Sequence, residues 1–449
     1  MSTIEKHDMT QGKILLPLVS FTIPLVLGNL FQLTYNAADS VIVGKYVGEQ
    51  ALAAVGTSTP IMNIAILLIS GMCMGASVLM SSQYGAKDYD TLSRQISTTM
   101  LAGCGFSVVF SLLMLLLANP VLRLIWVPET AIPEAAAYLR IIFMGLIFTF
   151  MYNFLANTMR ALGDSKTPLY FLVTSAFLNI FGDLFFVVVL RWGVAGSAIA
   201  TVCSEGLCCL LCGIYIKKKI PLLCLGKKWW VFDKSLLGKT VSYGSTSAMQ
   251  QVCLQLGKLI IQSVVNTQGV AVMAAFTAVN RVDDFAYTPQ QNIGHAMTTF
   301  LAQNKGAGHK ERMKKGFQTG LLIELVYSIG LFCVIWGLAP QIMTLFAEDG
   351  DAQVVSLGIS YLHLISWMYI LPGLTNGVQG FFRGIGDLKV TLYSTFMNMF
   401  GRVVAVFVMI RLLQMEFASL AWANMVGWIV MLLFEVPLLV KSMRNGECG

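Results

Sequence analysis

Long apolar stretches separated by short polar breaks recur along the whole chain. A helix needs about 20 apolar residues to cross the hydrocarbon core of a membrane. Twelve stretches reach that length, at about 14–44, 51–83, 92–118, 134–160, 165–190, 194–216, 236–266, 270–303, 316–338, 353–382, 388–411 and 416–440. The pattern therefore predicts an all-α polytopic membrane protein with twelve transmembrane helices.

The chain has few charged residues for its length. Of its 449 residues, 56% are hydrophobic and 12% are charged, whereas about a quarter of the residues in a typical soluble protein are charged. Because so few charges cannot coat a globule in water, the composition excludes a soluble protein. The ten cysteines lie mostly inside apolar stretches, and their spacing with histidine predicts no metal site.

Lys and Arg are distributed unevenly between alternate breaks. If the N-terminus is cytoplasmic, the cytoplasmic breaks hold most of these residues, including the run 217–219, and the opposite side keeps Lys45, Arg123, Arg140, Arg191 and Arg411. Cytoplasmic loops carry the excess of Lys and Arg in membrane proteins. We therefore expect a multi-pass protein of the plasma (inner) membrane with both termini cytoplasmic. The net charge of +7 then reflects orientation and predicts no nucleic-acid partner.

A motif occurs twice in the chain at a constant offset. Residues 160–170 match residues 383–393, and Asn153 and Asn376 keep the same offset of 223 (376 minus 153). The basic break 217–235 lies near the middle, so we expect an N-lobe at 1–216, a cytoplasmic linker at 217–235 and a C-lobe at 236–449. Six helices per half is an even number, which predicts two parallel repeats around a central cavity.

The first apolar stretch carries a polar stripe. Gln32, Tyr35, Asn36 and Asp39 fall on one face of a helix with 3.6 residues per turn. A carboxylate at membrane depth costs several kcal/mol unless it is paired, hydrated or protonated. Asp39 is therefore a candidate functional residue, and its partners must come from other helices.

With this layout the chain resembles the multidrug and toxic-compound extrusion (MATE) family of secondary transporters. The resemblance covers essentially the whole sequence. It rests on Pro24 and the stripe 35–39 in the first helix, on the motif 160–168 before the fifth helix, and on the repeat of that motif from Arg383. It implies a transporter, not an enzyme, that exports cationic or amphipathic drugs and toxic compounds in exchange for H⁺ or Na⁺.

The resemblance also implies a cation-coupling site in the N-lobe. The family's site combines an Asp on the first helix, an Asn and an Asp on the fifth and a Thr on the sixth, which match Asp39, Asn179, Asp183 and Thr201. These are hard oxygen ligands that could bind Na⁺ or share protons, and two nearby acids would titrate as a pair. H⁺ or Na⁺ is thus the expected coupling ion, with no cofactor and no other metal.

A hinge and a substrate cavity complete the expectation. Pro24 removes a backbone hydrogen bond inside the first helix and permits a bend. We expect protonation of Asp39 and Asp183 to change that bend and expel the substrate. The expected partners are a small cationic or amphipathic molecule and membrane lipid, with the protein a monomer. Residues expected to line the cavity are Gln32, Tyr35, Asn36, Asn153, Asn157, Gln255, Asn376 and Gln379.

The second half lacks the equivalent acids. The offset of 223 places Arg402 opposite Asn179 and Val406 opposite Asp183, and a shift by one turn places Arg402 opposite Asp183. The chain is therefore expected to resemble the DinF-like branch of the family more than the NorM-like branch. The roles of Asp283, Asp284 and Glu205 stay open between helix packing and a place in the cavity.

Two other classes are alternatives. A flippase of the same superfamily would move a lipid-linked or polysaccharide precursor, although such proteins often have more helices and a basic cavity. A membrane-embedded prenyltransferase would need paired Asp-rich motifs for Mg-diphosphate, and the chain offers only Asp283 and Asp284. No P-loop motif is present, so the energy for transport must come from ion gradients.

Overall fold

The computed structural model of the chain describes residues 8–125, 127–129, 131–220, 230–346, 352–413, 417 and 419–444. Within these residues it leaves the side chains of 36–38, 40, 49–53 and 411–412 undescribed. All regular elements of the described part are helices. Residues 221–229 of the predicted linker 217–235 lie outside the described residues.

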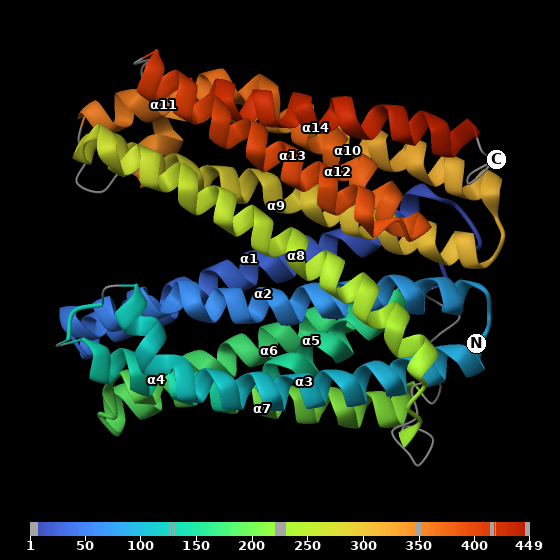
Figure 1. Cartoon of the computed structure of the whole chain (residues 1–449), viewed down its shortest axis with the longest axis horizontal. Coiled ribbons are helices and arrows are strands. Elements are labelled where there is room, and N and C mark those ends of the chain that lie inside the picture. Colours follow the sequence, from blue (N-terminus) through green and yellow to red (C-terminus); the bar gives the residue numbers. More distant parts are fainter. Residues whose placement is uncertain are drawn as a thin grey trace. The chain divides into compact units, whose positions relative to one another are not determined.

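The helices follow the predicted order of the apolar stretches (Figure 1). In chain order they are α1 (Leu15–Tyr46), α2 (Glu49–Gly85), α3 (Tyr89–Leu124), α4 (Ile132–Met144), α5 (Leu146–Ala161), α6 (Lys166–Asp183), η2 (Leu184–Val189), α7 (Gly193–Lys219), α8 (Lys234–Val265), η5 (Asn266–Gln268), α9 (Val270–Gly306), α10 (Lys310–Phe346), α11 (Ala352–Ser366), η7 (Trp367–Tyr369), α12 (Ile370–Ile385), α13 (Leu388–Val406), η8 (Phe407–Leu412) and α14 (Ser419–Arg444).

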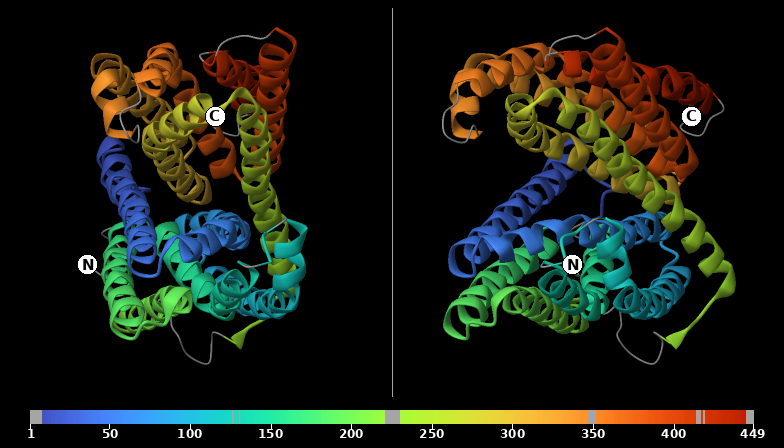
Figure 2. Two further views of the ribbon diagram at one scale, coloured as in Figure 1. Left: turned by 90° about the vertical axis from the view of Figure 1, so that its left-hand side faces the viewer. Right: turned by 60° about the vertical axis from the view of Figure 1, so that its left-hand side comes forward.

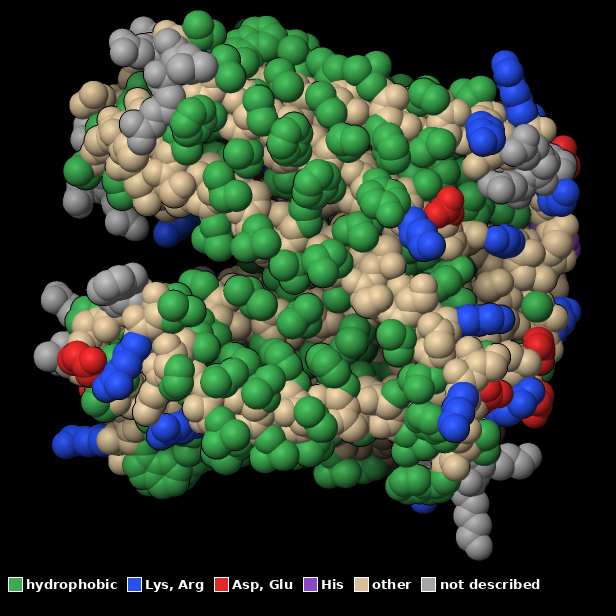
Figure 3. All heavy atoms as spheres, viewed as in Figure 1, with side chains coloured by type: hydrophobic (Ala, Val, Ile, Leu, Met, Phe, Trp, Pro, Cys, Tyr) green, Lys and Arg blue, Asp and Glu red, His purple; other side chains and the backbone are tan. Residues whose placement is uncertain are grey.

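Most of these helices are long and apolar enough to cross a membrane. Among the described residues, nine pass on length and composition alone, and the pair α4 and α5, bent by 47°, makes a tenth. The remaining two long helices, α8 and α9, are more polar, and α9 carries Arg281, Asp283 and Asp284. Apolar side chains cover the flanks of the helices, while most charged side chains gather near the helix ends (Figure 3).

Several spans are interrupted where the sequence pattern predicts continuous helices. The fourth span breaks between α4 and α5 at Gly145. The tenth changes from α11 through the 3₁₀ turn η7 into α12. The fifth and eleventh spans end in the π-helices η2 and η8. Apolar periodicity reports only that a stretch is buried or faces lipid, so it could not reveal these changes of winding.

The chain divides into two compact units. Unit 1 comprises Met1–Asp8 and Ile23–Ala248, and unit 2 comprises Met9–Thr22 and Met249–Gly449. Each unit is a bundle of helices packed side by side, as two further views show (Figure 2). The division falls inside α1 and inside α8, so the first turns of each of these helices belong to a different unit from the rest.

Each unit has its own apolar core. In unit 1 the core lies between α2, α3, α4 and α5 and includes Ile69, Phe143 and Phe150. In unit 2 it lies between α9, α10, α11 and α14 and includes Tyr361 and Tyr369. The repeated motif has a local role as well: the Asp164 carboxylate accepts the backbone N–H groups of Lys166 and Thr167 at 3.1 and 3.0 Å and so begins α6.

Candidate functional site

The close approach of α6 and α7 in unit 1 places polar side chains against each other. A Cβ atom added at Gly182 of α6 would lie 3.0 Å from Ala200 Cβ, and one at Gly196 of α7 would lie 3.0 Å from the Phe186 carbonyl oxygen. Small residues at such positions let helix backbones approach closely in membrane proteins. As a result the Asn179 side-chain N–H donates to Thr201 Oγ1 at 3.2 Å.

Asp39 of α1 reaches the same place from a third helix. Ser197 Oγ, one turn before Thr201 on α7, donates to Asp39 Oδ1 at 2.7 Å. Asp183 is completely buried, and its carboxyl group faces that of Asp39 closely enough for the two to share a hydrogen bond when one is protonated. The structure thus brings together the four residues that the resemblance implies.

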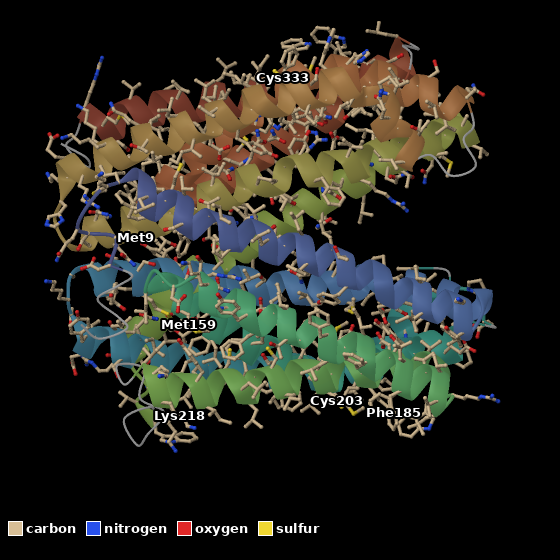
Figure 4. The ribbon with its side chains drawn as sticks, turned by 180° about the vertical axis from the view of Figure 1, so that it is seen from behind. Met9, Met159, Phe185, Cys203, Lys218 and Cys333 are labelled. Atoms are coloured by element: carbon tan, nitrogen blue, oxygen red, sulfur yellow. The ribbon has the colours of Figure 1, made fainter. Side chains whose placement is uncertain are left out.

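Ser197 is the partner that sequence reasoning missed. Ser197 lies four positions before Thr201, and the resemblance assigns it no role in the site. Its spacing of four residues from Thr201 places both hydroxyl groups on one face of α7, which was the available signal. Figure 4 labels Cys203, two residues after Thr201 on the exposed side of α7, between Lys218 near one end of the helix and Phe185 near the other.

The cluster contains more hydrogen-bond acceptors than donors. Within the described part of the chain, both carboxylate oxygens of Asp183 and the amide oxygen of Asn179 are buried without a donor. The Thr201 hydroxyl already donates to the Ser197 carbonyl oxygen at 3.2 Å. Buried acceptors without donors are costly. A proton or a hard cation would satisfy these oxygens, and either is compatible with an oxygen-only ligand set.

A third acid lies near the pair. Glu205, one turn beyond Thr201 on α7, accepts the Thr149 hydroxyl of α5 at 2.5 Å. Tyr35 of α1 interacts electrostatically with both Glu205 and Asp39. A Cβ at Gly145 would clash with Val202 of α7, so the chain approaches α7 closely one turn before Thr149. Glu205 therefore flanks the site in unit 1.

The residues expected to line a cavity are divided between the two units. Gln32 is exposed, Tyr35 is half-buried, and the side chain of Asn36 lies outside the described residues. Asn153 donates to the Thr149 carbonyl oxygen and Asn157 to that of Asn153, at 2.9 and 2.8 Å. The lining of a cavity by this set stays a prediction.

The expected cavity residues of unit 2 have different surroundings. Gln255 is half-buried on α8, and Asn376 donates to the Pro372 carbonyl oxygen of its own helix at 2.8 Å. Gln379 is buried and accepts Arg383 Nη2 at 2.7 Å and the Gln250 side-chain N–H at 3.2 Å. Its amide is thus held within the packed interior of unit 2.

The two acids of α9 separate into different environments. Asp284 forms an ion pair with Lys258 of α8 at 3.4 Å, with both side chains about half exposed. Asp283 is buried, and its carboxylate accepts the hydroxyl groups of Tyr369 and Tyr361 at 2.5 and 3.1 Å. The Tyr361 hydroxyl in turn accepts the Asn424 side-chain N–H at 2.8 Å.

The comparisons with known proteins agree with this architecture. The MatE family model matches residues 24–185 and 247–409, and the two matches begin 223 residues apart (247 minus 24), which is the offset of the repeated motif. A curated relative, the "Probable multidrug resistance protein YpnP" of Bacillus subtilis (strain 168), is 32% identical over 392 residues, or 87% of this chain and 86% of the relative.

Solved structures show the same fold. One is described as the "outward-facing conformation of a multidrug resistance MATE family transporter of the MOP superfamily" and has a TM-score of 0.91 at 22% identity, covering 100% of this chain and 99% of that one. Another, of a MOP superfamily transporter from Pyrococcus furiosus Vc1, has a TM-score of 0.91 at 21% identity and covers 99% of both chains. MATE transporters of this kind have twelve helices in two lobes.

Two matches of the family model, at the spacing of the internal repeat, cover most of the chain. The chain therefore belongs to the MatE family of membrane transporters and is not an enzyme.

Proposed function

We propose that the chain is a secondary antiporter that exports cationic or amphipathic compounds across the plasma membrane in exchange for H⁺ or Na⁺. The proposed coupling site is Asp39, Asn179, Asp183 and Thr201, with Ser197 as an added member. The observation that carries the proposal is a carboxyl pair made of the buried Asp183, which has no donor among the described residues, and the part-buried Asp39, which has one. Such a pair needs a cation in this arrangement and can release it when the helices separate.

The mechanism follows from the charge balance of this pair. Two carboxylates in a low-dielectric site repel each other, so a proton or Na⁺ is bound when the α1 face closes on α6 and α7. Binding of a cationic substrate nearby would favour the charged acids and loss of the coupling ion. Coupling thus arises because substrate and ion compete for the same negative charge.

The energetics set a limit on a one-for-one exchange. One pH unit supplies about 1.4 kcal/mol per proton, and a potential of about 100 mV supplies about 2.3 kcal/mol per charge. When a monovalent cation leaves for one entering proton, the voltage contributions cancel. A one-unit pH gradient then supports about tenfold accumulation of the substrate.

Reconstitution in liposomes tests the proposal. With an imposed pH or Na⁺ gradient, we expect the wild-type protein to move a fluorescent monovalent cation against its gradient, by about tenfold per pH unit for each proton exchanged. The double variant Asp39→Asn, Asp183→Asn keeps the shape of both side chains and should lose this accumulation. Asp284→Asn, which removes an exposed acid of unit 2, is the matched control. Accumulation by the double variant at the wild-type level would contradict the coupling assignment.

Pro24 is the proposed hinge of α1. The boundary between the two units falls between Thr22 and Ile23, directly before Pro24, and the proline leaves one carbonyl of the preceding turn without its helical partner. A bend at this point would move Asp39 relative to Asp183. We therefore expect Pro24→Ala to slow export severalfold while binding of the fluorescent cation is kept. Pro60→Ala, inside α2, is the control, and unchanged export by Pro24→Ala would remove the hinge from the mechanism.

A further inference from the structure

Two helix breaks occupy corresponding positions in the two halves. The fourth span breaks at Gly145, and the tenth passes through the 3₁₀ turn Trp367–Tyr369. The repeat offset of 223 carries Gly145 to Met368, inside that turn. In transporters built from repeats, interrupted helices at matching positions are the best sequence-level pointer to binding sites. The side chains beside each break are therefore candidate binding groups.

Each break lies beside a glutamate from a neighbouring helix. In unit 1 this is Glu205, which accepts Thr149 of α5. In unit 2 it is Glu324 of α10, in the turn before Ser328, whose hydroxyl donates to the Glu324 carbonyl oxygen at 2.7 Å. A Cβ added at Gly373 of α12 would lie 2.8 Å from Ser328 Oγ and 3.4 Å from Glu324 Oε2. The absent side chain of Gly373 thus leaves room for the Glu324 carboxyl group.

The Glu324 carboxyl group has no donor among the described residues. The side chain is 1% exposed, and both of its oxygens are buried without a hydrogen-bond partner. Gln290 of α9 lies on the same side of Gly373, but its amide nitrogen is used by Ser328 Oγ and by the Tyr369 carbonyl oxygen, at 3.1 and 2.8 Å. Its amide oxygen is also buried without a donor.

The other buried acids of unit 2, Asp283 and Glu435, each have an arginine nearby. Asp283 accepts two tyrosine hydroxyl groups and interacts with the Arg402 guanidinium. The Glu435 carboxyl group of α14 also lacks a hydrogen-bond donor among the described residues, but the Arg383 guanidinium supplies a positive charge near it. Glu324 forms no ion pair within the described part of the chain. A buried carboxyl group with neither a cation nor a hydrogen-bond donor beside it does not stay ionised, because the charged form loses its hydration without compensation.

We propose that Glu324 is a second proton-binding site, located in unit 2, and that it carries a proton in the conformation seen here. A protonated carboxyl group is neutral and adds an O–H donor. The unpartnered Gln290 amide oxygen beside it lacks such a donor. Na⁺ is the poorer occupant, because Ser328 Oγ and the Tyr369 carbonyl oxygen are already engaged with Gln290. The groups facing Glu324 are Gln290 from α9, Gly373 from α12, the Tyr369 carbonyl oxygen from η7, and Tyr327, an ionisable neighbour on its own helix.

The consequence for transport rests on the proposed antiport function. In each cycle Glu324 takes a proton from water on one side of the membrane and releases it to water on the other, in addition to the proton of the acid pair in unit 1. Two protons then exchange for one monovalent cation, so each cycle carries net charge. A potential equal in energy to one pH unit should change substrate accumulation about tenfold.

Glu324→Gln is the test variant, because glutamine copies the shape of a protonated glutamate. In liposomes we expect it to keep exchange driven by a pH gradient and to lose the tenfold response to the potential. Glu435→Gln, another buried acid of unit 2, is the matched control and should keep that response. A response to the potential that is equal in wild type and Glu324→Gln, whether large or absent, would overturn the proposal.

Infrared difference spectroscopy of the wild-type protein provides a second readout that needs no transport. Titration with acid should reveal the C=O stretch of a protonated carboxyl group that is absent from Glu324→Gln and shifted in Glu324→Asp. A spectrum without a pH-dependent band that is lost in Glu324→Gln would also overturn the proposal. If the wild type shows the band but moves no cation under any gradient, the antiport function fails and the proton site stands.

Discussion

At the scale of single residues, the chemistry of the buried acids depends on the donors that reach them. Asp283 receives two tyrosine hydroxyl groups, Asp39 receives one serine hydroxyl, and Asp183 receives none from the described residues. Each missing donor leaves negative charge that must be balanced by a mobile cation. The number of donors therefore separates acids that stabilise the helix bundle, such as Asp283, from acids that can exchange an ion, such as Asp183.

An acid outside the membrane spans offers a pH-dependent prediction. Asp88 precedes α3, and hydrogen bonds from Thr91, first from its side chain and then from its backbone N–H at 3.1 Å, lower the pKa of the Asp88 carboxyl group. A lowered pKa stabilises the folded state above the ordinary Asp value of about 3.9. That contribution is lost as the pH falls through the lower folded-state value.

We therefore expect Asp88→Ala to lower the Tm of the detergent-solubilised protein at pH 7. The difference from wild type should shrink only when the pH falls below about 4, where the carboxylate becomes protonated. Thermal unfolding of both proteins across a pH series measures this. A difference that is the same at every pH would show that the carboxylate charge does not support α3.

At the scale of elements, glycines decide which helices can touch. A Cβ at Gly71 of α2 would lie 2.6 Å from Ala248 Cα and 2.8 Å from Ala248 N of α8. Gly75, one turn later, lies against the Tyr243 carbonyl group of α8. This small-residue spacing is the pattern that allows close packing of membrane helices. It fastens the first half of α8 to unit 1, to which that half belongs.

Gly71→Ala should destabilise the protein because the new methyl group would overlap the backbone of Ala248, which cannot move away as a flexible side chain could. We expect a cost of about 1–3 kcal/mol, the usual range for overpacking, seen as a lower Tm in detergent. Gly56→Ala is the matched control in the same helix, since nothing lies within 4 Å of a Cβ there. It should be neutral or stabilise by up to about 1 kcal/mol through helix propensity. Equal Tm values for both variants would refute close α2–α8 packing at Gly71.

At the scale of the whole molecule, the two halves repeat a scaffold but not its chemistry. The family model matches both halves at the repeat offset, and both carry a break in the fourth helix of the repeat. The acid pair occurs in unit 1, whereas the corresponding part of α13 carries Arg402. The two halves therefore share their helices and helix breaks and differ in the acids of the proposed coupling site.

The predicted orientation is a whole-molecule property that labelling can check. In a background with Cys224 and Cys448 replaced by serine, Glu129→Cys should react with an impermeant maleimide in right-side-out vesicles. Lys218→Cys should react only after the vesicles are opened, because the Lys-rich end of α7 is expected in the cytoplasm. Labelling of Lys218→Cys in sealed vesicles would reverse the orientation.

The sequence by itself determined the helical class, the order and approximate bounds of the spans, and the internal repeat. These follow from apolar run length and a constant offset, which are local or linear properties of the chain. The resemblance also supplied Asp39, Asn179, Asp183 and Thr201, whose placement in one cluster the structure shows.

Only the tertiary structure decided which acids lack partners. Asp39, Glu205 and Glu324 each have a neighbour from another helix. Ser197 donates to Asp39, Thr149 donates to Glu205, and Tyr369 lies near Glu324. No spacing along the sequence relates these neighbours to the acids. The helix breaks at Gly145 and at 367–369 were equally hidden, because a stretch remains apolar whether its helix is continuous or interrupted. Donor balance and helix winding depend on packing between distant segments, and packing is settled only when the chain has folded.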